Sequence, residues 1–511
     1  QELAVSGPVS YGADRLEEVP HWPAGTLPDA PRDADGSDAN LSAAGAPVLS
    51  LTDALQVAAR DSRDYQDRKE DVFQAALDLD LERNDFRYLF TSTPSGTYTF
   101  DPGDDVDVQG VEGTASATVS RQLRSGAALT ARLFLDVVRL LTQSEASAYG
   151  LFADATISIP LLRGADEHIV TEPLTQAQRE VIYSLHTLER FRRVLAVRVA
   201  SEYLDVLQQL DQVRNAEENY RSLIAAGRRA RRLADAGRLP EIQVDQARQD
   251  ELRARNRWIS ARQAYARRLD ALKVTLGLPA DATVELDRGE LDRLAAAARD
   301  VAAADPAGAP APVQDANARI ELRPPDEEGG RYELPAEAAI AAGLGHRLDL
   351  RTAHGRVFDA QRKVVVAADA LRAGLTLVGT AEAGERRGLG SATRDDGYLR
   401  PETGLYTAGL LLDHPLERTA ERNAYRNSAI SLQRAVRTVQ ELEDQVKLQI
   451  RDALRTLVEA RESAKIQALA VTLARRRVAS TELFLQAGRA EIRDVLEAQE
   501  ALVSAQDALS A

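Results

Sequence analysis

The chain has 511 residues, a net charge of −15 and a pI of about 5.1. This acidic balance argues against a nucleic-acid partner, because nucleic-acid-binding surfaces are usually basic. The chain has no cysteine, which excludes disulfides, cysteine-ligated metals and cysteine nucleophiles. No apolar run approaches the roughly 18 residues that a membrane-spanning helix needs, so strands are the route by which such a chain would cross a bilayer.

Residues 1–48 are rich in Pro, Gly and Asp and indicate an extended N-terminal arm. The chain does not begin with Met, so we expect a processed start, for which a removed signal peptide is one explanation and a lipid anchor is left open. A helix is predicted from Thr52, which can cap it, to about Asp85. This helix opens the first of two structural units, over 49–286.

The pattern then changes to period two. A strand-like stretch interrupted by PSG and DPGDD is followed by runs at 113–122, 127–139 and 151–161, in which apolar and polar residues alternate. This pattern fits half-buried strands and equally fits a barrel with lipid outside and water inside. We assign the second and third runs to a membrane-spanning hairpin, and the first run to an extra strand below that hairpin. The strands of the first unit are thus expected within 113–161.

A long helix is predicted at 171–235, then a break at 236–241 and a second helix at 242–277. Apolar residues in the long helix recur at heptad-like spacing. At ~1.5 Å per residue it would be roughly 90 Å long, which is more than a globular core needs. Gly237 and Pro240 end it, because glycine stops helices and proline removes a backbone donor.

The same plan restarts after an acidic linker at 287–331 rich in Ala and Pro. The second unit, over 332–511, is expected to hold a helix, strands at 373–382 and 403–412, a long helix at 420–486, a break at 487–491 and a truncated helix at 492–511. The two breaks carry related phrases, AGRLPEIQVDQA and AGRAEIRDVLEAQ, which begin at positions 236 and 487. Because the first copy of the final helix is longer, we expect roughly 15–20 further residues after Ala511.

This duplicated plan resembles the TolC family of outer-membrane efflux channels. The resemblance covers roughly residues 49–511 and depends on the repeat, on IPLLRG at 159–164 before a long helix, and on the paired phrases. It implies a mainly α fold with a transmembrane β-barrel. Three chains, each giving four strands, would close a twelve-stranded barrel that continues as a long periplasmic α-helical barrel. It also implies a passive outer-membrane exit duct for efflux or secretion, which contacts outer-membrane lipid, a periplasmic adaptor and, indirectly, an inner-membrane transporter.

The resemblance also places functional residues at the two breaks, which would be hairpin tips at the periplasmic entrance. Asp494 and Glu497 match acids that narrow the entrance in family members. In a trimer they would form rings of carboxylates that attract cations. The structural alternative is that acids in a first helical turn only complement the helix dipole. The tip positions that match adaptor contacts are Gly237, Arg238, Leu239, Gly488, Arg489 and Ala490.

Nothing in the sequence indicates catalysis, a cofactor or a metal site. The six histidines include no pair spaced i, i+4 with a third ligand nearby, and no phosphate-binding or nucleophile-elbow motif is present. Tyr149, Phe152 and Tyr406 lie near predicted strand ends and fit either an aromatic girdle at a membrane surface or core packing. The rival function is a soluble coiled-coil scaffold or tether, which explains the helices but not the period-two runs in both units. The sequence does not identify the cargo.

Overall fold

The computed structural model describes residues 48–102, 108–142, 146–289, 334–414, 416–487 and 489–510, together with 293 and 296. The expected N-terminal arm, most of the expected linker and Gly488 lie outside these described residues. The chain divides into two compact units, which are described separately below. The sheet unit consists of Lys69–Leu188 and His346–Val446, and the tip unit of Gln1–Arg68, Glu189–Gly345 and Lys447–Ala511.

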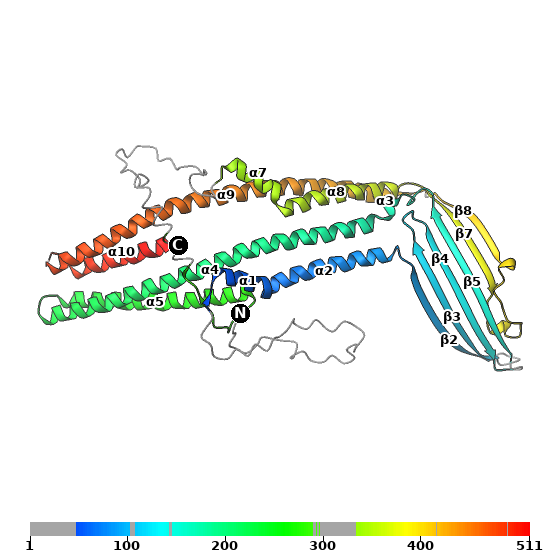
Figure 1. Cartoon of the computed structure of the whole chain (residues 1–511), viewed down its shortest axis with the longest axis horizontal. Helices are drawn as coiled ribbons and strands as arrows, with labels where there is room; N and C mark the ends of the chain where they lie inside the picture. Colours follow the sequence, from blue (N-terminus) through cyan, green and yellow to red (C-terminus); the bar gives the residue numbers. More distant parts are fainter. Residues whose placement is uncertain are drawn as a thin grey trace. The chain divides into compact units, whose positions relative to one another are not determined.

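The sheet unit is built on one six-stranded sheet in the order β2-β3-β4-β5-β7-β8, and all neighbouring strands are antiparallel (Figure 1). The strands are β2 (Leu89–Asp101), β3 (Val108–Gln122), β4 (Ala128–Leu140), β5 (Ser147–Pro160), β7 (Gly374–Glu385) and β8 (Leu405–Asp413). The two sequence repeats meet where β5 pairs with β7. The first repeat thus contributes four strands to the sheet and the second contributes two.

This sheet corrects the expectation of four strands per chain. The run at 113–122 is not a separate strand below the hairpin, because β3 pairs with β4 from Gly110 opposite Leu140 to Gln122 opposite Ala128. The stretch containing PSG forms a complete further strand, β2, which pairs with β3 along its whole length. Pro94 and Gly96 gave that stretch the appearance of a turn. Within the single chain proline is tolerated there because β2 is at the edge of the sheet, where one side of the strand makes no ladder hydrogen bonds.

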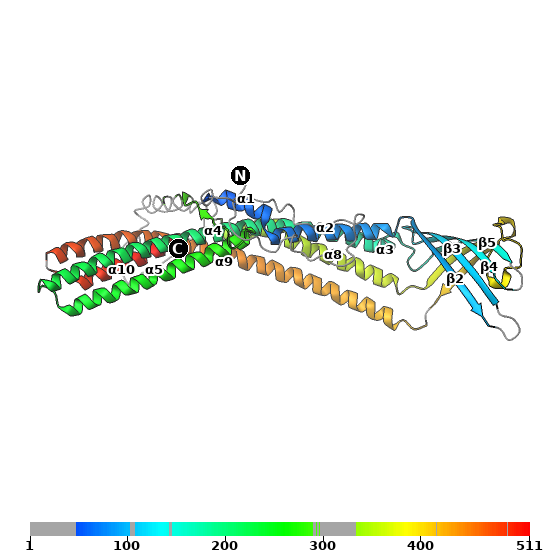
Figure 2. The ribbon, with the colours of Figure 1, turned by 90° about the horizontal axis from the view of Figure 1, so that it is seen from below.

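Helices adjoin one end of the sheet, and α8 packs there on the first part of α4 (Figure 2). The helices concerned are α2 (Arg63–Asn84), α3 (Glu167–Val170), α4 (Glu172–Asp235), α8 (Leu348–Asp369) and α9 (Thr419–Gln486). Asp359 of α8 is buried and forms ion pairs with Arg179 of α4 and Arg362 of α8. Arg362 in turn donates to Glu172 at 2.9 Å. Such a network holds α8 in one register on α4, because each buried charge has an opposite partner.

Tyr183 of α4 belongs to the same network and provides a pH-dependent test of it. Its hydroxyl donates to Asp359 Oδ2 at 2.7 Å. Burial raises the pKa of Tyr183 to about 12, and the hydrogen bond to the Asp359 carboxylate acts in the same direction. The neutral phenol is therefore favoured in the folded state, so its stabilising contribution is complete below about pH 10 and is lost as the pH rises towards 12.

We expect one of the 13 tyrosines to titrate about two pH units above the usual value of 10. An absorbance titration of the folded protein, minus that of Tyr183→Phe, isolates this group. The Asp359→Asn variant should bring the titration of Tyr183 back towards 10, because it removes the carboxylate acceptor. A difference titration centred on 10 in the parent protein would show that the contact is absent.

The core of the tip unit forms where short N-terminal elements pack on α4. The strand β1 (Val48–Leu49) pairs in parallel with β6 (Glu285–Leu286), and α1 (Leu51–Asp61) follows. Ser50, rather than Thr52, caps α1: its side chain accepts from the Asp53 backbone, and the Asp53 carboxylate accepts from the Ser50 backbone. The predicted helix from Thr52 to Asp85 is interrupted at Ser62, where α1 ends before α2 begins.

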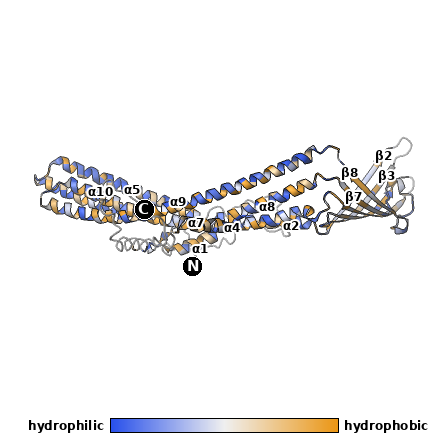
Figure 3. Ribbon diagram, turned by 90° about the horizontal axis from the view of Figure 1, so that it is seen from above, coloured by the Kyte–Doolittle hydropathy of each residue, from blue (hydrophilic) through white to orange (hydrophobic). Residues whose placement is uncertain are grey.

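Two helical hairpins complete the tip unit. After α4 ends at Asp235, α5 (Glu241–Leu276) runs back along it, and α10 (Ile492–Ser510) runs back along α9 (Figure 1). A second buried cluster joins α4, α5 and α10 through Leu223, Ala230, Val244, Ala247, Ala254 and Leu496. The remaining described helix, α7 (Ala336–His346), precedes α8. Hydrophilic and hydrophobic residues are interspersed along all these helices (Figure 3), and none in the described part of the chain is both long and apolar enough to span a membrane.

Candidate functional site: a two-faced sheet and two helical tips

The sheet has an apolar face that is exposed to solvent in the single chain. Residues directly opposite each other in antiparallel strands point to the same side, so the strand register assigns each side chain to a face. Leu133, Leu135 and Val137 of β4 share one face and are each between 42% and 46% exposed. The residues that share this face include Phe90, Tyr98, Ala117, Val119, Leu129, Tyr149, Ile157, Leu377, Tyr406 and Leu410.

The opposite face is mainly hydroxylic and charged. One row across the sheet contains Thr118, Arg132, Asp154 and Glu382, at directly opposite positions on β3, β4, β5 and β7. Further residues on this face include Thr91, Thr93, Thr97, Thr114, Ser116, Thr130, Thr156, Thr380 and Thr407. A sheet with one apolar and one polar face over all its strands is suited to a boundary between lipid and water.

The sheet ends in two strand edges that have no partner within the described residues. There β2 pairs only with β3, and β8 pairs only with β7. Unpaired backbone donors and acceptors along such edges favour addition of another strand. The two edges belong to different strands and are therefore different surfaces.

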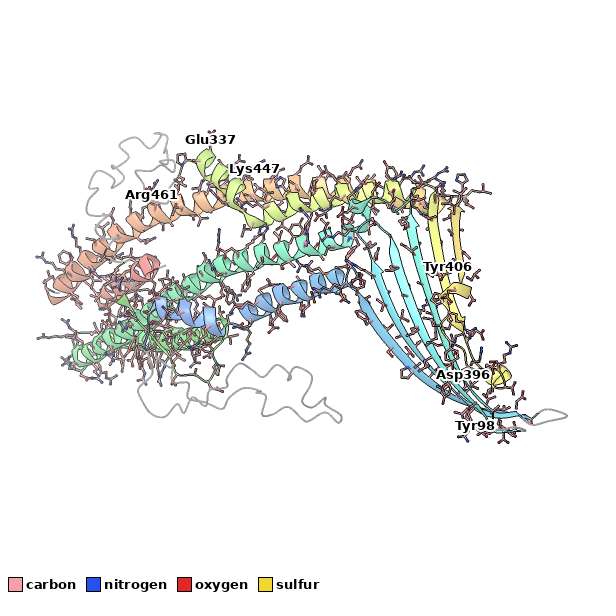
Figure 4. The ribbon with its side chains drawn as sticks, turned by 45° about the vertical axis from the view of Figure 1, so that its right-hand side comes forward. Tyr98, Glu337, Asp396, Tyr406, Lys447 and Arg461 are labelled. Atoms are coloured by element: carbon pink, nitrogen blue, oxygen red, sulfur yellow. The ribbon has the colours of Figure 1, made fainter. Side chains whose placement is uncertain are left out.

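Of the aromatic residues considered for a membrane girdle, two are on the apolar face and one is not. Tyr149 and Tyr406 are on the apolar face and are exposed. Tyr406 is labelled in Figure 4 on the strand at the sheet edge. Phe152 is on the polar face beside Phe134, with ring centroids 6.1 Å apart. Phe152 therefore does not share a face with Tyr149 and Tyr406, because successive residues of a strand point to opposite sides.

The first tip is a tight, locally satisfied turn between α4 and α5. Gly237 has a φ of +67°, and its N–H donates to Ala234 O at 2.8 Å. The Arg238 N–H donates to Leu233 O at 2.9 Å, and these two bonds close the end of α4. The Arg238 side chain is exposed, whereas Leu239 packs against the buried cluster of the hairpin.

The second tip, between α9 and α10, contains the acidic pair. Asp494 and Glu497 are exposed on the first turns of α10. The Glu491 N–H donates to Asp494 Oδ2 at 2.9 Å, and Arg493 Nε donates to Glu497 Oε1 at 3.0 Å. Within one chain both carboxylates therefore have local partners, as the helix-dipole alternative expects, and any ring of carboxylates needs further copies of the chain. Arg489 is exposed, and Ala490 is half-buried.

Polar contacts connect α10 to the first hairpin. Asn215 of α4 donates to Asp507 at 2.8 Å, and Arg257 of α5 pairs with Glu500 at 3.0 Å. Burial raises the pKa of Asp507, against the opposing effect of the hydrogen bond from Asn215. These contacts, together with Leu496 in the shared apolar cluster, link the two hairpins within the chain.

Sequence reasoning missed two features of this architecture. Ile242, Leu483 and Phe484 are large apolar residues that are more than half exposed at the tips. The first part of the segment between β7 and β8 also folds onto the polar face of the sheet, where Arg386 contacts Asp136 of β4. Both features depend on how distant segments pack in the folded chain, and the pattern of apolar and polar residues within one segment does not show this packing. Among the described residues, no group of three or more His, Asp or Glu is placed to hold a metal ion.

Comparison with known proteins identifies the fold. No protein-family model matches the chain, and no curated protein matches its sequence. Among solved structures, the chain is similar to the outer-membrane protein VceC of Vibrio cholerae, with 14% identity and a TM-score of 0.60 over 90% of this chain and 91% of that one. It is also similar to the outer-membrane channel CmeC of Campylobacter jejuni, with 13% identity and a TM-score of 0.60 over 90% and 81%. It is similar, too, to the open state of the outer-membrane channel MtrE of Neisseria gonorrhoeae, with 11% identity and a TM-score of 0.52 over 90% of this chain and 84% of that one. The chain therefore has the TolC-like fold of these outer-membrane channels.

Proposed function

We propose that the chain is one protomer of a passive outer-membrane exit duct for efflux or secretion. The observation that carries this proposal is the sheet, with an exposed apolar face, a polar opposite face and two edges to which no strand of the described residues pairs. Lipid tolerates strands only where every backbone group is paired, which requires a closed barrel. The polar face would line the water-filled lumen, and the helices would lie in the periplasm.

The edges support a closed ring of identical chains. β2 runs away from the helices and β8 runs back towards them, so β8 of one copy can continue the antiparallel order beside β2 of the next. Interfaces between unlike surfaces close into rings when the rotation fits. The expected twelve-stranded barrel assumed four strands from each of three chains. The sheet of one chain has six strands, so three copies would supply eighteen. Barrels of this size leave an aqueous channel.

The tips support coupling to a periplasmic adaptor and, through it, to an inner-membrane transporter. Ile242, Leu483 and Phe484 present exposed apolar side chains in the helix ends that flank the two turns, and the cations Arg238 and Arg489 within the turns are also exposed. Exposed apolar groups with a charged rim are typical of protein-docking surfaces. Gly237, Arg238, Leu239, Gly488, Arg489 and Ala490 remain the proposed adaptor-contacting positions, of which Gly488 lies outside the described residues.

Asp494 and Glu497 are proposed to form the cation-attracting constriction. Replacement by amides removes both charges, and the amide oxygen at position 494 would still accept the hydrogen bond from the Glu491 N–H. We expect the double variant Asp494→Asn with Glu497→Gln to lose most of its cation preference, because rings of carboxylates select cations. The measurement is the reversal potential in a salt gradient across a planar bilayer. Unchanged conductance and selectivity would sink this assignment.

The rival proposal is a soluble coiled-coil scaffold, and membrane partition separates the two. We expect the expressed protein to sediment with membranes, to need detergent for extraction and to have the mass of three chains plus bound detergent. A protein that stays monodisperse without detergent would favour the scaffold. A detergent-dependent oligomer of another size would still support an outer-membrane duct, but would show that the duct is not a trimer.

A further inference from the structure

The first part of the connection between β7 and β8, residues 386–395, folds back over the polar face of the sheet, whereas Pro401 near the other end of the connection accepts a hydrogen bond from Tyr406 on the apolar face. This connection belongs to the end of the sheet farthest from the helices, here called the far end, where Asp396 and Tyr98 lie (Figure 4). Leu389–Ser391 forms a short 3₁₀ turn that contacts β3 and β4, so the segment reaches across β5 from its start on β7. It then returns to the edge of β5, where the Gly397 N–H donates to Tyr149 O at 2.7 Å.

Burial at the far end shows which face is covered. Val138 and Ala148 are opposite each other on the polar face, and both are 0% exposed. Their neighbours Val137 and Tyr149, opposite each other on the apolar face, are 42% and 53% exposed. The same two strands are thus covered on one side only.

One buried carboxylate fixes the segment in this position. Asp136 of β4 is 0% exposed and accepts from Arg386 Nε at 2.6 Å, from Arg386 Nη2 at 3.1 Å and from the Arg387 N–H at 3.1 Å. Thr114 of β3 donates to the same carboxylate at 3.1 Å. The Arg386 guanidinium also stacks over Phe134, 4.2 Å from the ring centroid. A bidentate, charge-assisted contact of this kind is among the stronger hydrogen-bonded pairs.

Two glycines on the polar face make room for the segment. A Cβ on Gly150 would lie 2.7 Å from the Arg387 nitrogen, and a Cβ on Gly110 would overlap Leu389. The buried Arg387 donates to Asp395 O at 3.1 and 2.8 Å, so the segment is also internally tied. The sheet and the segment are therefore built to fit each other.

We infer that residues 386–395 form a constriction at the outer mouth of the duct, held in the lumen by Asp136. This inference rests on the proposed function, because the polar face becomes the lumen wall only in a closed barrel. Six strands per chain make the barrel wider than four would, and an inward-folded segment from each copy narrows it again. The segment thereby sets an upper size limit for cargo that leaves the duct.

The absence of cysteine in the chain allows a labelling test from outside the cell. Thr130→Cys places one thiol on the polar face near the helical end of β4, on the inner side of the constriction; Leu129→Cys places one on the apolar face. A small water-soluble thiosulfonate and a maleimide carrying a long poly(ethylene glycol) chain are added to whole cells. We expect the small reagent to label the thiol at 130 and the large reagent to label it poorly.

Release of the segment should remove the size limit. In Asp136→Asn we expect the large reagent to label the thiol at 130 at least about tenfold faster, which corresponds to about 1.4 kcal/mol in the closed-to-open equilibrium. Labelling by the small reagent should stay the same. Arg386→Gln removes the same contact from the loop side and serves if Asp136→Asn does not assemble. Glu402→Gln changes an exposed carboxylate of the same connection and is the matched control.

The outcomes separate this inference from the proposed function. If the large reagent labels the thiol at 130 equally fast in the parent, in Asp136→Asn and in Arg386→Gln, the inferred constriction is contradicted, whereas the proposed duct is not. A thiol at 130 that the small reagent does not reach from outside, with ready labelling at 129, would overturn the duct itself. Faster labelling in Glu402→Gln, to the same extent as in Asp136→Asn, would show that Asp136 is not the residue that holds the segment.

Discussion

Gly277→Ala is expected to destabilise the folded protein by about 3 kcal/mol or more, by the cost of a left-handed backbone together with overpacking. Gly277 ends α5 with a φ of +82°, and the Leu278 N–H donates to Lys273 O at 2.8 Å. A Cβ at this position would overlap the Asp61 carbonyl oxygen at the end of α1. Because that neighbour is backbone, it cannot move aside as a flexible side chain would.

The matched control is Gly237→Ala at the first tip. Gly237 has a similar φ of +67°, but a Cβ there would meet nothing within 4 Å. Gly237→Ala should therefore lower the free energy of unfolding only by the cost of a left-handed backbone at alanine, about 1–2 kcal/mol. Denaturant unfolding of the full chain in detergent, followed by helical circular dichroism, compares the two. Equal destabilisation would mean that α1 does not press on Gly277 in solution.

Tyr203→Ala is the second large effect, expected at about 3–5 kcal/mol because a fully buried aromatic ring is lost. Tyr203 of α4 is 0% exposed and lies in the main cluster of the tip unit with Val199, Val206 and Leu207. Its hydroxyl lies 2.9 Å from Leu49 O and 2.7 Å from Asp287 O, and donates to one of these carbonyls at a time. It thereby joins α4 to the C-terminal end of the parallel β1–β6 pair.

Tyr203→Phe separates the two contributions. It keeps the ring and removes only the hydroxyl, so we expect a loss of about 1–2 kcal/mol from the one hydrogen bond that the hydroxyl donates; Leu49 O still accepts from the Asp287 N–H at 2.8 Å. The same denaturant experiment measures both variants. A Phe variant as unstable as the Ala variant would indicate that the hydrogen bonds, rather than apolar burial, hold β1 and β6 against α4.

The sequence predicts the parts of this fold that depend on local periodicity. Alternation along β4 and β5 reports the two faces correctly, because successive side chains of a strand point to opposite sides. The strand β2 was obscured by Pro94 and Gly96, which signal a turn locally but are tolerated at a sheet edge. Thr52 and Ser50 are both good capping residues, and only the backbone geometry decides that Ser50 is the cap.

The candidate site could be predicted only where a short motif carried it. The paired Ala-Gly-Arg phrases located both tips, because glycine near a helix end signals a turn. The contact of Asp136 with Arg386 joins residues 250 positions apart, and neither the strand around Asp136 nor the polar loop around Arg386 carries a motif that points to the other. Exposure of Leu483 and Phe484 likewise follows from packing, since helical spacing alone does not say which stripe a neighbour covers.

The most direct test of the duct is single-channel recording of the purified protein in a planar lipid bilayer. We expect discrete, cation-selective conductance steps that divalent cations added from one side reduce, because three chains would bring Asp494 and Glu497 together around the axis. Failure to insert, with a soluble and highly helical particle in the absence of detergent, would contradict the assignment of the sheet to a membrane and favour the scaffold.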